Sequence, residues 1–165
     1  MDRRVFEYDV YEGIKAKNEP LPVIRYFKVE TEALPSCCLW YPEREAKEGL
    51  LLTTNDQYKM KVWNPSAQSS RLTCLGPTYG GKITKMKKLE VPNSDDNYLV
   101  YSTPEKVIGM IKMPLRGNPH QMMGLIAHPK KIQDFCCTSD GRYLFTTGGD
   151  DLSVMMWAID VAPIE

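Results

Sequence analysis

The chain has 165 residues, of which 42% are hydrophobic and 25% are charged, a balance typical of one globular domain. Its 21 Lys and Arg residues equal its 21 Asp and Glu residues, so no overall charge favours binding to nucleic acid or to an anionic membrane. No stretch has the apolar length of a signal peptide or of a membrane-spanning helix. The sequence therefore predicts a soluble, intracellular protein.

The apolar segments are short, are rich in Val, Ile, Leu, Met and Tyr, and alternate with turn residues such as Gly80 and Gly81. This pattern favours β-strands, and no segment has the period of an amphipathic helix. In chain order, strands are predicted at residues 5–10, 23–29, 36–41, 49–54, 59–63, 71–75, 83–89, 98–102, 107–112, 122–127, 132–137, 143–147 and 153–159. The sequence therefore predicts an all-β fold.

One unit near the C-terminus has the order of a repeat. It begins at His128, turns at Asp140 and Gly141, turns again before Asp151, and closes on a strand that ends in Trp157. This order resembles the WD40 repeat, which is the blade of a β-propeller. The expected fold is therefore a β-propeller built from radial four-stranded sheets.

The WD40 resemblance implies a buried chain of hydrogen bonds in this unit. In the family, the turn aspartate, here Asp151, orients the histidine, here His128. The histidine contacts a hydroxyl on the middle strand, and that hydroxyl contacts the indole N–H of Trp157. We assign the hydroxyl to Thr147, with Thr146 as the alternative.

The other units match the repeat less completely. Trp63 marks one blade, but Gln57 stands at the position of the turn aspartate, so the polar chain is doubtful there. Ile111 replaces the tryptophan of the next blade, which is expected to pack by apolar contacts alone. Tyr8 follows Asp2 by six residues, as Trp157 follows Asp151, so the chain is expected to begin inside a blade.

We therefore predict a partial WD40 propeller whose ring is not closed. It has a blade remnant at residues 1–30 and about three four-stranded blades at roughly 31–76, 77–127 and 128–165. Exposed strand edges without ring closure are expected to leave the isolated chain marginally stable or prone to aggregation.

A closer resemblance rests on the order of several short stretches: residues 34–42, 75–81, 98–101, 117–120, 127–129 and 143–151. Together they resemble the C-terminal propeller region of the cilia- and flagella-associated protein 251 family, WD-repeat proteins of motile cilia and sperm flagella. The resemblance implies a cytoskeletal scaffold in the axoneme, within the calmodulin- and spoke-associated complex that fixes a radial spoke to the doublet microtubule. Long members carry an EF-hand-like segment, but no such loop exists here, so calcium binding is not carried over.

Catalytic, metal and cofactor sites are not predicted. The WD network explains His128 without catalysis, and His120 is expected in a loop; the chain has only these two histidines. Adjacent cysteines at 37–38 and 136–137 point to opposite faces of a strand, so zinc binding is disfavoured. The odd count of five cysteines fits reduced thiols.

A basic segment is the best candidate for a partner-binding surface. Lys82, Lys85, Lys87 and Lys88 alternate with Ile83, Met86 and Leu89, so one face of the predicted strand is expected to be buried and the other to present lysines. The surface is expected either to be simply solvated or to contact an acidic partner such as tubulin. A WD40 adaptor of another intracellular complex, such as a ubiquitin ligase, is the alternative function.

Overall fold

A computed structural model describes residues 2–15, 19–41, 49–91 and 96–165. The strands are β1 (Arg4–Tyr8), β2 (Val23–Lys28), β3 (Pro35–Trp40), β4 (Leu51–Asn55), β5 (Lys59–Asn64), β6 (Ser69–Leu75), β7 (Lys85–Leu89), β8 (Asn97–Ser102), β9 (Val107–Met113), β10 (Met122–Ile126), β11 (Ile132–Cys137), β12 (Tyr143–Gly148) and β13 (Ser153–Ala158). A helix α1 (Val10–Lys15) lies between β1 and β2, and two 3-10 helices, η1 (Pro119–Gln121) and η2 (Ala162–Ile164), lie before β10 and after β13. No helix in these ranges is long and apolar enough to cross a membrane.

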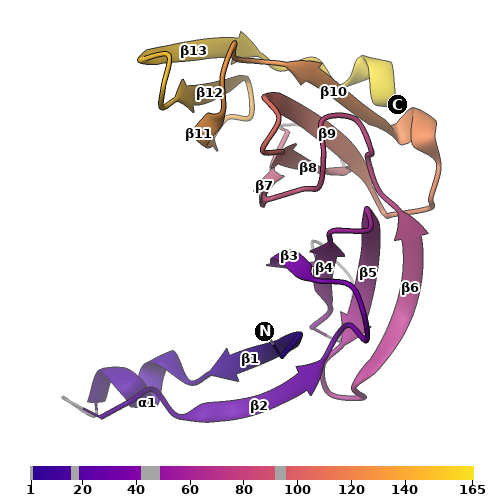
Figure 1. Cartoon of the computed structure of the whole chain (residues 1–165), viewed down its shortest axis with the longest axis vertical. Coiled ribbons are helices and arrows are strands. Elements are labelled where there is room, and N and C mark those ends of the chain that lie inside the picture. The colour runs from indigo at the N-terminus through magenta and orange to yellow at the C-terminus, as the bar shows by residue number, and fades with distance from the viewer. Residues whose placement is uncertain (1, 16–18, 42–48, 92–95) are drawn as a thin grey trace.

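The strands form four antiparallel sheets that follow one another along an open arc (Figure 1). Their strand orders are β1-β2, β3-β4-β5-β6, β10-β9-β8-β7 and β11-β12-β13. In Figure 1 the β1–β2 sheet lies at one end of the arc and the β11–β13 sheet at the other. We call these sheets 1 to 4 in chain order. Sheets 2 and 3 are complete four-stranded blades, and the ring is not closed.

A left-handed residue precedes the equivalent strand of each sheet, and Gln68 (49°) is a further one, directly before β6. Four residues other than glycine have a positive φ directly before β1, β5, β9 and β13: Arg3 (57°), Tyr58 (60°), Lys106 (73°) and Leu152 (54°). In the first three sheets the carbonyl of this residue accepts a backbone hydrogen bond from a residue beyond the next strand, namely Val29, Gly76 and Ala127. The repeat is therefore visible in the backbone even where side chains differ.

Apolar side chains fill the spaces between successive sheets. Phe27 and Val29 pack with Leu51 between sheets 1 and 2. A larger cluster that includes Leu52 and Ile111 lies between sheets 2 and 3, and another that includes Ile108 and Phe135 lies between sheets 3 and 4. Each internal sheet is therefore covered on both faces, as expected for a stack of blades.

The all-β prediction is confirmed, and each predicted strand overlaps an observed one. Two details differ. Sheet 4 has three strands within the described residues, whereas four were expected in each of three blades. The helix α1 was not predicted, because its six residues carry no buried face and therefore no apolar period. The blade boundaries after residues 30, 76 and 127 stay a prediction.

Candidate functional site

A buried polar chain holds sheet 4 together. His128 lies between β10 and β11, and its side chain is 0% exposed. Its Nδ1 lies 2.8 Å from Asp151 Oδ2, and its Nε2 lies 2.7 Å from Thr146 Oγ1. Trp157 Nε1 donates a 2.9 Å hydrogen bond to the same Thr146 oxygen. Four residues from the loop, the middle strand, the tight turn and the last strand are thus linked.

The direction of these hydrogen bonds follows from the donors available. Because Trp157 Nε1–H only donates, the Thr146 oxygen accepts from it and its hydroxyl hydrogen is free to donate to His128 Nε2. His128 Nδ1–H then donates to the Asp151 carboxylate. Burial acts to raise the pKa of Asp151, but the hydrogen bonds from His128 and Ser153 outweigh it and lower this pKa below its ordinary value.

The assignment of the hydroxyl to Thr147 was wrong, and its alternative Thr146 is the residue in the chain. Neighbouring side chains of a strand point to opposite faces, so only one threonine can face Trp157. The Thr147 hydroxyl instead donates to the Asp134 carbonyl at 3.2 Å and accepts from the Asp134 N–H at 3.1 Å. Thr147 therefore bridges β12 to the irregular part of β11.

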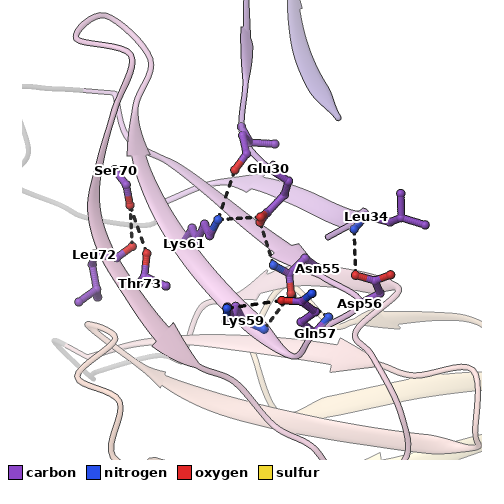
Figure 2. A network of polar contacts seen from close by, with 11 residues as sticks. Glu30, Leu34, Asn55, Asp56, Gln57, Lys59, Lys61, Ser70, Leu72 and Thr73 are labelled. Atoms are coloured by element: carbon purple, nitrogen blue, oxygen red, sulfur yellow. Dashed lines mark hydrogen bonds and ion pairs between the residues drawn. The ribbon is translucent and has the colours of Figure 1, made fainter. Parts of the chain in front are cut away.

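Sheet 2 contains a different polar network at the corresponding place (Figure 2). Glu30 is 6% exposed and lies just after β2, as His128 lies just after β10. Its carboxylate accepts a 2.8 Å hydrogen bond from Asn55 Nδ2 and pairs at 2.7 Å with Lys61 Nζ. Asn55 Oδ1 in turn accepts from the N–H groups of Gln57 and Lys59, both at 3.0 Å.

Glu30, Asn55 and Lys61 were not predicted from the sequence. Gln57 in place of the turn aspartate made the family's polar chain doubtful here, but the residues that replace it are of other types than those of the family. The available signal was positional, since Glu30 lies two residues beyond β2 and His128 two residues beyond β10. In the described part of sheet 2, Trp63 Nε1 and Thr53 Oγ1 are buried with no hydrogen-bond partner, in contrast to Trp157 and Thr146.

Sheet 3 uses a tyrosine where sheet 4 has its threonine. Tyr101 is 1% exposed and faces Gly109 across the β8–β9 pair. Its hydroxyl donates to the Met123 carbonyl at 3.1 Å, and burial raises the pKa of Tyr101 to about 12. A Cβ on Gly109 would lie 2.4 Å from the tyrosine ring, so glycine is needed there. The expectation that this blade packs by apolar contacts alone was therefore incomplete.

The lysines at 82–88 are placed differently from the expectation of one buried and one basic face. Met86 packs toward sheet 2 and Leu89 toward sheet 4, because neighbouring sheets cover both faces of β7. Lys85 Nζ donates to the Gln133 carbonyl at 2.7 Å and pairs with Asp134 at 3.2 Å. These contacts join β7 to β11.

Two further lysines of this segment also make contacts within the chain. Lys87 Nζ donates to the Phe135 carbonyl and lies 5.2 Å from the Phe135 ring centroid. Lys88 pairs with Glu90 at 2.9 Å. Lys82 is half-buried in the segment before β7. The side chains of Lys85, Lys87 and Lys88 still keep 47%, 45% and 39% of their surface exposed, so a partner can reach them.

The remaining blade markers lie at turns and strand ends. Gly141 has a φ of 66° in the β11–β12 turn, and Asp140 accepts a hydrogen bond from the Thr138 hydroxyl beside it. Tyr8 ends β1 and is 46% exposed. Asp2 Oδ1 accepts from the Arg4 N–H, as Asp151 Oδ1 accepts from the Ser153 N–H.

The metal-binding side chains and the thiols of the described residues are not gathered into one site. Among the described residues, no group of three or more His, Cys, Asp and Glu is placed to hold a metal ion. The five cysteines, all within the described ranges, are free thiols, and burial raises the pKa of Cys37, Cys74 and Cys137. The arrangement described above links strands and sheets.

Sequence comparison relates the chain to ciliary proteins. It is 41% identical over 181 residues to cilia- and flagella-associated protein 251 of Tetrahymena thermophila, covering 99% of this chain and 18% of that protein. It is 34% identical over 167 residues to the Mus musculus protein of the same name, covering 99% of this chain and 12% of that one. The chain thus spans less than a fifth of these relatives. No family model matches it.

Structure comparison finds the same fold in subunits of two assemblies. A chain in the crystal structure of the Chaetomium thermophilum Polycomb Repressive Complex 2 matches with a TM-score of 0.62 at 16% identity, covering 87% of this chain and 29% of that one. A chain of the Mitotic Checkpoint Complex matches with a TM-score of 0.59 at 15% identity, covering 94% and 41%. These neighbours are WD40 propellers, so the four sheets correspond to part of such a propeller.

Proposed function

Since the chain is homologous to cilia- and flagella-associated protein 251 across nearly its whole length, we propose that it is a non-catalytic, protein-binding scaffold of motile cilia and flagella. Its role is to help anchor a radial spoke to the doublet microtubule of the axoneme. The observation that carries this proposal is the 34–41% identity maintained over 99% of the chain.

The arrangement of polar groups supports a scaffold. Hydrogen bonds link His128, Asp151, Thr146 and Trp157 to one another. Glu30 is likewise hydrogen-bonded to Asn55 and paired with Lys61. Buried groups that satisfy each other stabilise a rigid arrangement of sheets. Such sheets present broad faces, edges and loops to other proteins.

The partners we propose are tubulin and the axonemal proteins of the spoke-base complex, a complex that contains calmodulin. Lys82, Lys85, Lys87 and Lys88 form the proposed contact with an acidic partner surface, because part of each of the last three side chains reaches solvent. Lys85 and Lys87 also contact residues of sheet 4, so experiments must separate their contribution to partner binding from their contribution to stability.

A tagged chain, expressed at its native level in a motile ciliated cell, tests the proposal. Cilia are isolated, their membranes are removed with detergent, and the axonemes are washed with salt. The chain is expected in the axonemal fraction together with spoke-base proteins. The same fractionation of a strain that lacks radial spokes tests whether retention of the chain depends on the spokes. Release of the whole pool with the membrane and soluble fraction would contradict the proposal.

A further inference from the structure

The junction between sheets 2 and 3 is hollowed on the outer side of the arc, where the terminal strands β6 and β10 lie (Figure 1). A groove of about 310 Å³ runs between the end of β6, the residues that follow it and the start of β10. We call it the β6–β10 groove. Sheets 2 and 3, which border it, each have four strands. Its lining includes Leu75, Pro77, Tyr79, Tyr101, Met122 and Met123.

The groove lies where sheet 3 departs from its neighbours. Glu30 and His128, each two residues beyond the last strand of the preceding sheet, enter the polar networks of sheets 2 and 4. Pro77 holds the corresponding place before sheet 3, and its side chain has no hydrogen-bonding group. Tyr101 instead donates its hydroxyl hydrogen to the Met123 carbonyl. Both Pro77 and Tyr101 line the groove, which therefore occupies the place of the missing network.

The walls of the groove expose apolar surface. Leu75 is 60% exposed and Tyr79 is 56% exposed, whereas Tyr101 is 1% exposed and forms the floor. On the β10 side, a Cβ at Gly124 would lie 2.8 Å from the Tyr101 hydroxyl, so this position presents bare backbone. Exposed apolar walls mark binding grooves, and glycine in a strand allows another backbone to approach closely.

The rim of the groove is basic. Lys59 faces Leu75 across the β5–β6 pair and is exposed on the sheet 2 side. Arg116 is exposed on the sheet 3 side, directly before the lining residue Gly117. Among the described residues that line the groove, none is acidic. A cation on each wall favours an occupant that carries carboxylates.

We propose that the β6–β10 groove binds an extended segment of another protein, in which acidic residues flank a pair of apolar side chains. The apolar side chains contact Leu75 and Tyr79, and the acidic residues contact Lys59 and Arg116. In the described part of the chain β6 and β10 are terminal strands of their sheets, so each offers a backbone edge to an extended segment. The groove is separate from the β7 lysines, which lie at the opposite edge of sheet 3, and the proposal does not rest on the ciliary role.

Peptide display on the purified chain tests the proposal. A phage library of short random peptides is panned against the parent chain, and binders are counter-selected against the double variant Leu75→Glu with Tyr79→Glu. The recovered peptides are expected to share two apolar residues flanked by Asp or Glu. Leu152→Glu with Tyr11→Glu is the matched control, because it makes the same chemical change at side chains that are 93% and 83% exposed outside the groove. Far-UV circular dichroism compares the folding of every variant with the parent.

Fluorescence anisotropy of the consensus peptide then measures its affinity. The groove variant is expected to weaken binding by about tenfold, and the control variant is expected to bind like the parent. Lys59→Glu with Arg116→Glu is expected to weaken the acidic peptide and to favour a peptide in which its acidic residues are replaced by lysine. This reversal would not follow from a merely structural effect of the two substitutions.

Several results would overturn the proposal. They are a library without recurrent binders, a basic or wholly polar consensus, equal loss of affinity in the control variant, and no change of preference in the charge-reversed variant. Sedimentation velocity of the parent chain and the groove variant tests a different occupant. Self-association that the groove variant alone abolishes would assign the groove to a second copy of the chain, against the proposal.

Discussion

The indole N–H of Trp157 and the hydroxyl of Thr146 are 2.9 Å apart, and this bond connects the last strand of sheet 4 to its middle strand. The same hydroxyl lies 2.7 Å from the buried His128 ring. Thr146 is therefore the branch point of the polar chain.

Replacing Thr146 by Val is expected to lower the free energy of unfolding by about 1–3 kcal/mol, because His128 Nε2 and Trp157 Nε1 would lose their shared partner. Thr147→Val is the matched control with an expected loss of about 1 kcal/mol, since its hydroxyl bonds only to the Asp134 backbone. Urea unfolding followed by tryptophan fluorescence, at a concentration at which the chain is monomeric, measures both. Equal losses would mean that Thr146 has no special position.

Asp151 is expected to make the free energy of unfolding depend on pH. Its pKa is lower in the folded chain than in the unfolded chain, where an aspartate has a pKa of about 3.9. The stability that it contributes is therefore fully present above about pH 5 and is lost as the pH falls through the folded pKa. Urea midpoints measured from about pH 6 downward are expected to fall less steeply for Asp151→Asn than for the parent. Parallel curves would argue against the assigned hydrogen bonds.

Glu30 and Lys61 are expected to depend on each other. Glu30→Gln alone leaves the Lys61 ammonium, whose side chain is 18% exposed, without its charged partner, and the expected loss is on the order of 3 kcal/mol. The double change Glu30→Gln with Lys61→Met removes both charges and is expected to cost less than the sum of the single changes. A double-mutant cycle from chemical unfolding measures this coupling. Additive losses would show that the two charges do not interact.

The lysine segment predicts binding to an acidic surface. Lys82→Glu with Lys88→Glu is expected to weaken salt-sensitive co-sedimentation with doublet microtubules at least tenfold, while the Lys85 and Lys87 contacts to β11 stay intact. Lys130→Glu with Lys131→Glu is the control of equal charge change, because both lysines are exposed in the β10–β11 connection. Unchanged binding by the first pair would remove this surface from the proposal.

Much of the fold was readable from the sequence because propeller strands are short and their turns carry glycine and acidic residues. The strand that ends in Trp157 and the turn before it led directly to the WD40 unit of sheet 4. The helix α1 gave no such signal, since it buries no residue. The choice between Thr146 and Thr147 needed the strand register, which decides the face that each side chain occupies.

The polar network of sheet 2 was not readable in the same way. Glu30, Asn55 and Lys61 occupy a place that the repeat gives to other residue types, and they lie up to 31 residues apart. The placement of the β7 lysines was not predicted either. An alternating strand usually has one buried face and one solvent-exposed face. Neighbouring sheets lie on both faces of β7, so Lys85 and Lys87 contact Asp134 and Phe135 of sheet 4.

The left-handed corners before β1, β5, β9 and β13 are occupied by arginine, tyrosine, lysine and leucine, none of which adopts that conformation readily. A side chain at such a corner costs about 1–2 kcal/mol, whereas glycine would cost about 0.4–1 kcal/mol through the freedom that it adds to the unfolded chain. Glycine at Leu152, which is 93% exposed, would therefore make the arc harder to unfold. The free energy of unfolding can therefore be raised at these corners without altering any contact between the blades.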